Sequence, residues 1–241
     1  MMIFCGDSHV RPFEYNVFEG GQDDDVRKYS HLVWKAGATA AGFARKTSRR
    51  QLSAAFADAC AKVGPKRVCF NLGQVDAEVG FYFATMTKGP LEFEPWLTER
   101  YEAFISHAQS FGLSFVVKGL NPSTLISEER LKSYIRRTTI KSFPTRSDFR
   151  IAFRSIAPLV SVQQHAERNV IAQSILQQIC RRETIPFFDI RDLTMSPSDE
   201  GLAKPEFVAP HLDVHLIDSF ALRQAYRDEV QSAFRFVRRA A

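Results

Sequence analysis

The sequence lacks any uninterrupted apolar run of the roughly 20 residues that a membrane-spanning helix needs. Its N-terminus also lacks the basic start and the long apolar stretch of a secretory signal. The 241 residues are 45% hydrophobic and 24% charged, which is the balance of an ordinary globular domain. No linker or internal repeat divides the chain. We therefore expect one cytoplasmic domain over residues 1–241, with no membrane partner.

Cysteine is scarce, and no two of the four cysteines form a C-x-x-C pair. Each lies in or beside an apolar pattern, which favours buried free thiols over a disulfide or a metal site. They are Cys5, Cys60, Cys69 and Cys180. The sequence implies no metal and no organic cofactor.

Zinc-knuckle, helix-turn-helix and RNA-recognition patterns are also missing. The net charge of +5 comes from scattered basic residues, and pairs such as Arg49-Arg50 and Arg238-Arg239 lie far apart in the chain. Dispersed pairs are typical of solvated helix faces, whereas a nucleic-acid site needs a concentrated patch. Nucleic acid is therefore not an expected partner, and the sequence makes no prediction of oligomeric state.

Five short apolar runs are present, and they favour β-branched and aromatic residues. They are apolar on consecutive positions, which is typical of strands covered on both faces in a parallel sheet. The runs cover residues 3–5, 31–35, 67–72, 114–119 and 185–190.

Helical patterns separate these runs. Apolar residues recur at helical spacing over 51–63, 94–111 and 161–182, and a last helix is expected over 216–237. Short helices are expected within 121–160, a proline-containing loop over 196–210 and an acidic loop at 23–25. Strands that alternate with helices predict an α/β domain with a parallel sheet.

Parallel sheets bind ligands beyond the carboxyl ends of their strands, so the residues that follow each strand are the candidates for a site. Gly6-Asp7-Ser8-His9 follows the first run, Gly37-Ala38-Thr39 the second and Gly73-Gln74-Val75-Asp76 the third. His211-Leu212-Asp213-Val214-His215-Leu216 precedes the last helix. We expect these four groups to meet at one edge of the sheet.

These groups resemble the sequence blocks of the SGNH, or GDSL-like, hydrolase superfamily. Gly6-Asp7-Ser8 matches the block with the nucleophilic serine, Gly37-Ala38-Thr39 resembles the glycine block, and Asp213-Val214-His215-Leu216 resembles the histidine block. The order and spacing span nearly the whole chain. The resemblance implies a three-layer α/β/α flavodoxin-like sandwich, here with a five-stranded parallel sheet.

The chain departs from that pattern at three positions. His9 follows the serine where leucine is commoner, and Val75 occupies the place of the asparagine in the third block. Leu212 stands where the acid of the last block is expected, and Asp213 lies two residues before His215. Either the local turn adapts to this shorter spacing, or a backbone carbonyl helps the histidine instead.

Three side chains could perform nucleophilic catalysis. A serine hydroxyl needs a base, and imidazole titrates near neutrality, so His215 could activate Ser8. Asp213, with His211 as a weaker alternative partner, could orient His215. The alternatives are structural: Ser8 could cap a turn, His215 could be a capping or surface residue, and Asp213 could be a helix N-cap.

A developing oxyanion needs preorganised hydrogen-bond donors. The resemblance implies the backbone N–H groups of Ser8 and Gly37, and the Gln74 amide could replace the donor missing at Val75. Alternatively, Gln74 faces solvent. Asp7 is expected to brace its own turn, and Asp76 to structure a loop.

The sequence therefore predicts a serine-dependent ester hydrolase that works through an acyl-enzyme and takes a small-molecule or saccharide ester. The resemblance suggests O-acetyl groups of carbohydrates or other small acyl esters, but no residue identifies the substrate. Two alternatives stay open. One is a binding or assembly protein that kept the fold without efficient catalysis, and the other is an O-acyltransferase that uses the same serine.

Overall fold

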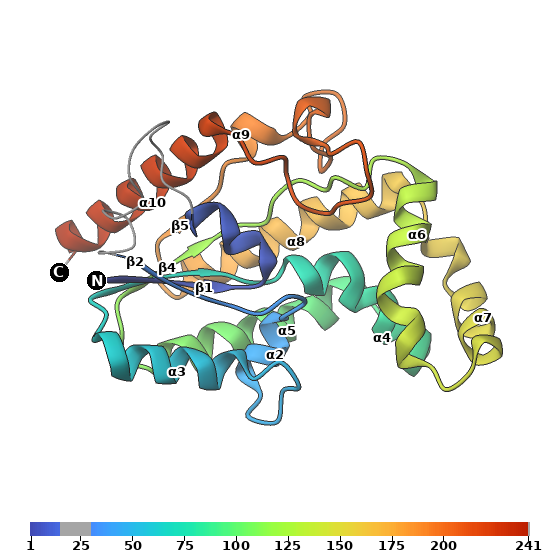
Figure 1. Ribbon diagram of the computed structural model, residues 1–241, viewed down its shortest axis with the longest axis horizontal. Helices are drawn as coiled ribbons and strands as arrows, with labels where there is room; N and C mark the ends of the chain where they lie inside the picture. The colour runs from blue at the N-terminus through green and yellow to red at the C-terminus, as the bar shows by residue number, and fades with distance from the viewer. Residues whose placement is uncertain (15–29, 241) are drawn as a thin grey trace.

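A central β-sheet runs through the computed structural model, which describes residues 1–14 and 30–240 (Figure 1). The acidic residues 23–25 lie outside the described part. The sheet has five strands, all parallel, in the order β2-β1-β3-β4-β5. The strands are β1 Met2–Gly6, β2 Ser30–Trp34, β3 Arg67–Asn71, β4 Phe115–Lys118 and β5 Phe187–Phe188. The predicted five-stranded parallel sheet is confirmed.

The strands form because consecutive apolar residues face two different cores. In β1, Ile3 and Cys5 belong to the core on one face, whereas Phe4 belongs to the core on the other. The same alternation separates Phe70 from Cys69 in β3. A strand that is buried on both faces therefore reads as a continuous apolar run.

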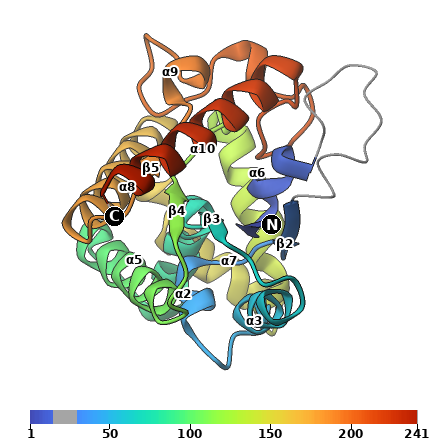
Figure 2. The ribbon, with the colours of Figure 1, turned by 90° about the vertical axis from the view of Figure 1, so that its left-hand side faces the viewer.

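Helices cover both faces of the sheet and complete a three-layer sandwich (Figure 2). Helices α2 Ala40–Ala44, α3 Leu52–Val63, α5 Phe93–Gln109 and α8 Val162–Arg182 pack on one face. The other face carries the 3₁₀ helix η1 Ser8–Glu14 and helix α10 Phe220–Ala240. The predicted α/β/α fold is therefore confirmed.

The boundaries differ from the prediction mainly before the last helix. Helix α10 begins at Phe220 rather than at residue 216, because Leu216 forms an antiparallel bridge with Val208 and the Ile217 N–H bonds to the Phe207 carbonyl. The predicted loop over 196–210 contains one 3₁₀ turn, η5 Pro205–Phe207, and the short helix α9 Arg191–Thr194 precedes it. Among the helices of the described residues, none has the length and apolar character of a membrane crossing.

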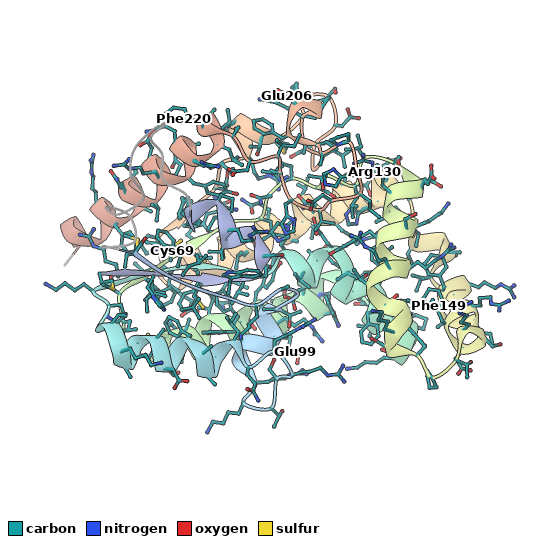
Figure 3. All side chains as sticks on the ribbon, viewed as in Figure 1. Cys69, Glu99, Arg130, Phe149, Glu206 and Phe220 are labelled. Carbon is teal, nitrogen blue, oxygen red and sulfur yellow. The ribbon has the colours of Figure 1, made fainter. Side chains whose placement is uncertain are left out.

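A third apolar cluster lies at the end of the molecule away from both termini, where Phe149 is labelled in Figure 3. It is formed by α4 Phe81–Lys88, α6 Glu128–Thr139 and α7 Arg146–Ser155. The π-helical turn η2 Asp76–Gly80 leads from β3 into α4. The side chains of Leu212 and Val214 pack against this cluster, so the segment before α10 is anchored there.

Candidate active site

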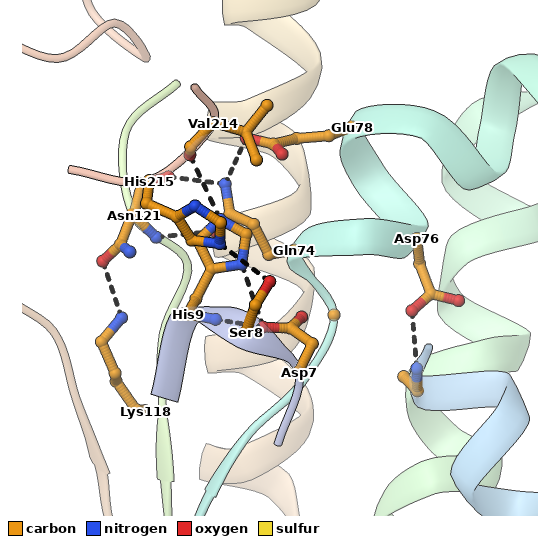
Figure 4. Close-up of polar contacts among 12 residues, drawn as sticks. Asp7, Ser8, His9, Gln74, Asp76, Glu78, Lys118, Asn121, Val214 and His215 are labelled. Atoms are coloured by element: carbon orange, nitrogen blue, oxygen red, sulfur yellow. Dashed lines mark hydrogen bonds and ion pairs between the residues drawn. The ribbon is translucent and has the colours of Figure 1, made fainter. Parts of the chain in front are cut away.

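Ser8 and His215 come together from opposite ends of the chain. Ser8 begins η1 directly after β1, and His215 lies in the segment that precedes α10. The Ser8 Oγ lies 2.8 Å from the His215 Nε2, as Figure 4 shows. Placement of both residues at the carboxyl edge of the sheet predicted this proximity, and the structure has it.

Asp213 reaches His215 through a tight local turn. One carboxylate oxygen, Oδ1, accepts both the His215 backbone N–H at 3.0 Å and the Nδ1–H of its ring at 2.6 Å. The turn therefore adapts to the shorter spacing, and the second explanation, a backbone carbonyl in place of the acid, is not needed. Because Nδ1 carries the proton that faces the carboxylate, Nε2 is left to accept the Ser8 hydroxyl proton.

Asp7-Ser8-His9 repeats the same local geometry. The Asp7 Oδ1 accepts the His9 backbone N–H at 2.8 Å and lies 2.9 Å from the His9 Nδ1. The Nε2 of His9 lies 3.2 Å from the Val214 carbonyl oxygen. The middle residue of each Asp-x-His turn thus bonds the histidine of the other turn, and the two imidazole rings lie 4.7 Å apart (Figure 4).

The two turns differ in exposure. The side chains of Asp7 and His9 are 0% and 2% exposed, whereas those of Asp213 and His215 are 36% and 34% exposed. A cavity of about 300 Å³ opens on Ser8 and His215. Its other lining residues include Arg11, Pro12, Asn121, His211, Ile217 and Tyr226. Only the second turn therefore presents its acid–histidine pair substantially to solvent.

The ionisation of the second turn suits a base. Burial lowers the pKa of His215, the neighbouring His9 lowers it further, and Asp213 opposes both effects. Burial alone would raise the pKa of Asp213, but the hydrogen bonds from the His215 backbone and ring outweigh it and lower that pKa. At neutral pH the pair is therefore an ionised carboxylate beside a neutral imidazole.

Gln74 is buried, so its alternative placement as a solvent-facing residue is wrong. Its Oε1 accepts the Asn121 backbone N–H at 2.8 Å, and its Nε2 donates to the Asn121 carbonyl at 3.2 Å. The same Nε2 donates to Glu78 at 2.7 Å. The Gln74 amide therefore ties the end of β3 to the end of β4, and its donors are engaged there rather than in the cavity.

Lys118 and Asn121 are site residues that the sequence analysis missed. The Lys118 Nζ is buried and donates to the Asn121 Oδ1 at 2.8 Å, and the Tyr226 hydroxyl donates to the same oxygen at 2.8 Å. Burial lowers the pKa of Lys118 to about 8. These bonds fix the amide of Asn121, which lines the cavity. A lysine inside a doubly buried strand was the available signal, since such a cation needs partners.

Gly37 and Asp76 lie away from the cavity lining. Gly37 has a positive φ of 68°, is exposed, and is not among the residues that line the cavity. The Asp76 Oδ2 accepts the Ala40 N–H at 2.6 Å and so joins the end of β3 to the start of α2. Burial raises the pKa of Asp76 to about 7. The loop-structuring role expected for Asp76 agrees with this bond.

Metal ligation has no evident place among the described residues. No group of three or more histidine, cysteine, aspartate or glutamate side chains within 1–14 and 30–240 is arranged to hold an ion. Cys5, Cys69 and Cys180 are buried and Cys60 is half-buried, each as a free thiol.

Comparison with known proteins bears on the fold. No protein-family model and no curated protein matches the chain. Among solved structures, a GDSL-like lipase from Bacteroides thetaiotaomicron superposes with a TM-score of 0.56 at 11% identity, over 96% of this chain and 88% of that one. An acetyl xylan esterase superposes with a TM-score of 0.50 at 15% identity, over 96% and 98%. The chain therefore has the fold of the GDSL-like hydrolases, as the sequence blocks predicted.

Proposed function

We propose that this protein is a serine-dependent ester hydrolase, with Ser8 as nucleophile, His215 as base and Asp213 as the acid that orients His215. The observation that carries the proposal is the continuous hydrogen-bond chain from the Ser8 Oγ through His215 to Asp213, at the mouth of a cavity. A nucleophile, a base within hydrogen-bond reach and a group that orients the base are the parts that this chemistry requires. The fold shared with GDSL-like hydrolases supports the same conclusion.

In the first step, the Ser8 Oγ attacks the acyl carbon of the ester while its proton passes to the His215 Nε2. The tetrahedral intermediate collapses as His215 returns that proton to the departing alcohol, which leaves an acyl-Ser8 ester. In the second step, a water molecule attacks the acyl carbon while His215 takes its proton. His215 then returns the proton to the Ser8 Oγ as the carboxylic acid leaves. Asp213 stabilises the imidazolium that forms in both steps.

The Ser8 backbone N–H is the first oxyanion donor in this proposal. Ser8 lines the cavity, and no hydrogen bond among the described residues occupies its N–H. Gly37 remains the second proposed donor, although it would have to approach the bound substrate from outside the cavity lining. Gln74 could contribute only by releasing its bonds to Glu78 and Asn121.

The substrate we propose is a small acyl ester, with O-acetyl groups of carbohydrates as the leading class. A cavity of about 300 Å³ is at the small end for ligand sites and accommodates a short acyl group more readily than a long chain. Polar residues such as His211 and Asn121 at its lining offer hydrogen bonds to hydroxyl groups. A superposable structure is an acetyl xylan esterase, which supports testing acetylated sugars first.

Hydrolysis of p-nitrophenyl acetate and of acetylated xylo-oligosaccharides tests the proposal. Ser8→Ala should lower kcat by about 10⁴-fold or more. The matched control is Ser53→Ala, because Ser53 also bonds a histidine, His107 at 2.7 Å, but on the opposite face of the sheet. The control should retain wild-type activity. Equal activity in wild type and Ser8→Ala would overturn the proposal.

The binding-protein alternative keeps one observation in its favour, because Val75 offers no side-chain donor and the Gln74 amide is already bonded. A folded protein that neither cleaves these esters nor forms an adduct with a fluorophosphonate would support that alternative. An O-acyltransferase would form the adduct and acylate an added sugar while hydrolysing esters slowly. The two assays together separate the three functions.

A further inference from the structure

His9 has an acceptor at each ring nitrogen. Its Nδ1 lies 2.9 Å from the Asp7 Oδ1, which also accepts the His9 backbone N–H. Its Nε2 lies 3.2 Å from the Val214 carbonyl oxygen, which can only accept. A neutral imidazole has one N–H and would leave one of these contacts without a proton. Both bonds are formed at once only when both ring nitrogens carry protons.

We infer that His9 is held as an imidazolium between Asp7 and the Val214 carbonyl. There it positions the Asp213-Val214-His215 turn, and its positive charge disfavours protonation of His215. This inference rests on the proposed function, because it concerns the residue proposed as the base. His9 lines the cavity but transfers no proton and forms no bond with substrate in the proposed steps, so its role is to position and to polarise. The contact between His9 and the Val214 carbonyl can affect the site because Val214 lies between the proposed acid, Asp213, and the proposed base, His215.

The charges around His9 support the cationic form. Asp7 and Glu78 are both buried, and each has one carboxylate oxygen without a hydrogen-bond partner among the described residues. Burial alone would lower the pKa of His9, but the Asp7 charge and hydrogen bond, the Glu78 charge and the Val214 bond together raise it. Burial raises the pKa of Glu78 to about 7, with His9 and Gln74 opposing.

Besides His9, two aspartates act on the charge of His215. Asp213 bonds its ring and favours the protonated form, and Asp7 favours it at longer range. His211 lies 3.8 Å from the other oxygen of Asp213. Burial and the His9 cation act in the opposite direction, and they prevail. His9 therefore counterbalances the aspartate that a histidine base needs for its orientation.

The Val214 carbonyl is one of several that are held in this segment. Thr124 donates to the Asp213 carbonyl at 3.0 Å, and Arg130 donates to the carbonyls of Ala209 and Pro210 at 2.8 and 2.7 Å. The segment should therefore stay folded when His9 is replaced. That makes the effect of His9 on His215 measurable in a variant.

The test is nitrogen NMR of the histidine rings in the full-length protein, titrated from pH 5 to 9. The inference predicts that both nitrogens of His9 carry protons at pH 7, with the shifts of an imidazolium. A neutral His9 with one bare nitrogen at pH 7 would overturn it. This measurement uses the wild-type chain alone, so it decides the matter even where a variant fails to fold.

The variant His9→Gln removes the charge and keeps a side chain of similar length. The titration midpoint of His215 should rise by about one pH unit, since like charges within 4–6 Å disfavour each other. The acid limb of kcat/KM should move up by the same amount. The matched control, His31→Gln, changes an exposed histidine on β2 and should leave both unchanged. An unmoved midpoint in a folded His9→Gln protein, with kcat reduced equally at every pH, would show a merely structural role and contradict the inference.

The failure of this inference can be told from the failure of the proposed function. The NMR midpoint of His215 requires no substrate, so it shifts in His9→Gln whether or not the protein cleaves esters. Conversely, an active esterase with a neutral His9 would leave the proposed function intact and remove the inference alone.

Discussion

Asp7-Ser8-His9 and Asp213-Val214-His215 are the same three-residue turn in two environments. In each, one carboxylate oxygen accepts the backbone N–H and the ring nitrogen of the histidine two residues later. The first pair is almost fully buried, and the second is about one-third exposed. The shared turn sets the orientation of each ring, so it cannot explain any difference in their chemistry.

The partner of the second ring nitrogen makes the difference. The His9 Nε2 faces a carbonyl oxygen, which only accepts, so this nitrogen must carry a proton to form the bond. The His215 Nε2 faces the Ser8 hydroxyl, which can donate, so this nitrogen can be unprotonated. The carboxylates of Asp7 and Glu78 and the Val214 carbonyl stabilise a cation at His9 against the opposing effect of burial, and that cation in turn disfavours one at His215. One local motif thus yields a fixed ion pair in one place and a neutral base in the other.

The largest expected effect separates the two histidines. His215→Gln should lower kcat for p-nitrophenyl acetate by about 10⁴-fold or more, because no base remains for Ser8. His9→Gln should lower it far less at pH 8.5, where His215 is neutral in either protein. Steady-state kinetics of the two variants at that pH check this. Equal losses would mean that the two turns do not divide their roles as described.

Replacing Asp7 should reduce the stability of the protein more than replacing Asp213, although Asp213 belongs to the turn that is expected to matter more for activity. Asp7→Asn leaves the buried His9 without its anion, and breaking a buried ion pair costs about 3–5 kcal/mol. Asp213→Asn removes a carboxylate that is about one-third exposed and should cost less than about 1 kcal/mol. Urea unfolding at pH 7 measures both. Asp213→Asn should instead lower kcat by about 10²–10⁴-fold, because the wrong tautomer of His215 becomes available.

Glu78 predicts a pH dependence of stability. Its pKa is raised by burial to about 7 in the folded protein, above its ordinary value of 4.5. Between those values the unfolded chain binds fewer protons, so the contribution of Glu78 to the stability of the folded state falls as pH rises from about 4.5 to 7. Glutamine does not titrate. The free energy of unfolding of Glu78→Gln, relative to wild type, should therefore rise by about 3 kcal/mol between pH 4.5 and 8.

Urea unfolding of both proteins at pH 4.5, 6 and 8 measures that difference. A difference that stays constant with pH would show that Glu78 has the same pKa in the folded and the unfolded chain, and it would contradict the raised pKa of this buried carboxyl group. The comparison with wild type is needed because burial lowers the pKa of His165 to about 3, and that residue gives the opposite slope below pH 6.5.

The smallest expected effect is a shift of the acid limb of the kcat/KM profile of the wild-type protein below the ordinary pKa of histidine. The pKa of His215 is lowered from 6.5 by burial and by His9, so the neutral base persists below the ordinary range of histidine. The profile of kcat/KM should therefore fall on acidification with a midpoint below 6.5. A midpoint above 6.5 would show that Asp213 dominates and that His9 does not balance it.

Sequence patterns were enough to predict the sheet and the meeting of Ser8 with His215. Runs that are apolar at every position indicate doubly buried strands, and parallel strands place their carboxyl ends on one edge. The sequence also contains Asp-x-His at 7–9 and at 213–215, but it does not indicate what the repeat does. Spacing alone does not reveal that each turn bonds the histidine of the other.

The buried polar contacts beneath the site could not be predicted in the same way. Gln74 looked like a loop residue because nothing local to it indicates that Asn121 covers it from the next strand. Lys118 and Tyr226 meet at the Asn121 Oδ1 from β4 and α10, which are a hundred residues apart in the chain. Such partners depend on how the ends of strands and a distant helix pack together, and local periodicity does not encode that packing.

Mass spectrometry of the protein after treatment with a fluorophosphonate tests the central claim most directly. If the exposed turn activates Ser8, wild-type protein should gain a single adduct at pH 8, and peptide mapping should locate it on Ser8. His215→Gln should remain unlabelled, whereas His9→Gln should still be labelled. An adduct on any other residue, or none on a folded wild-type protein, would contradict the account.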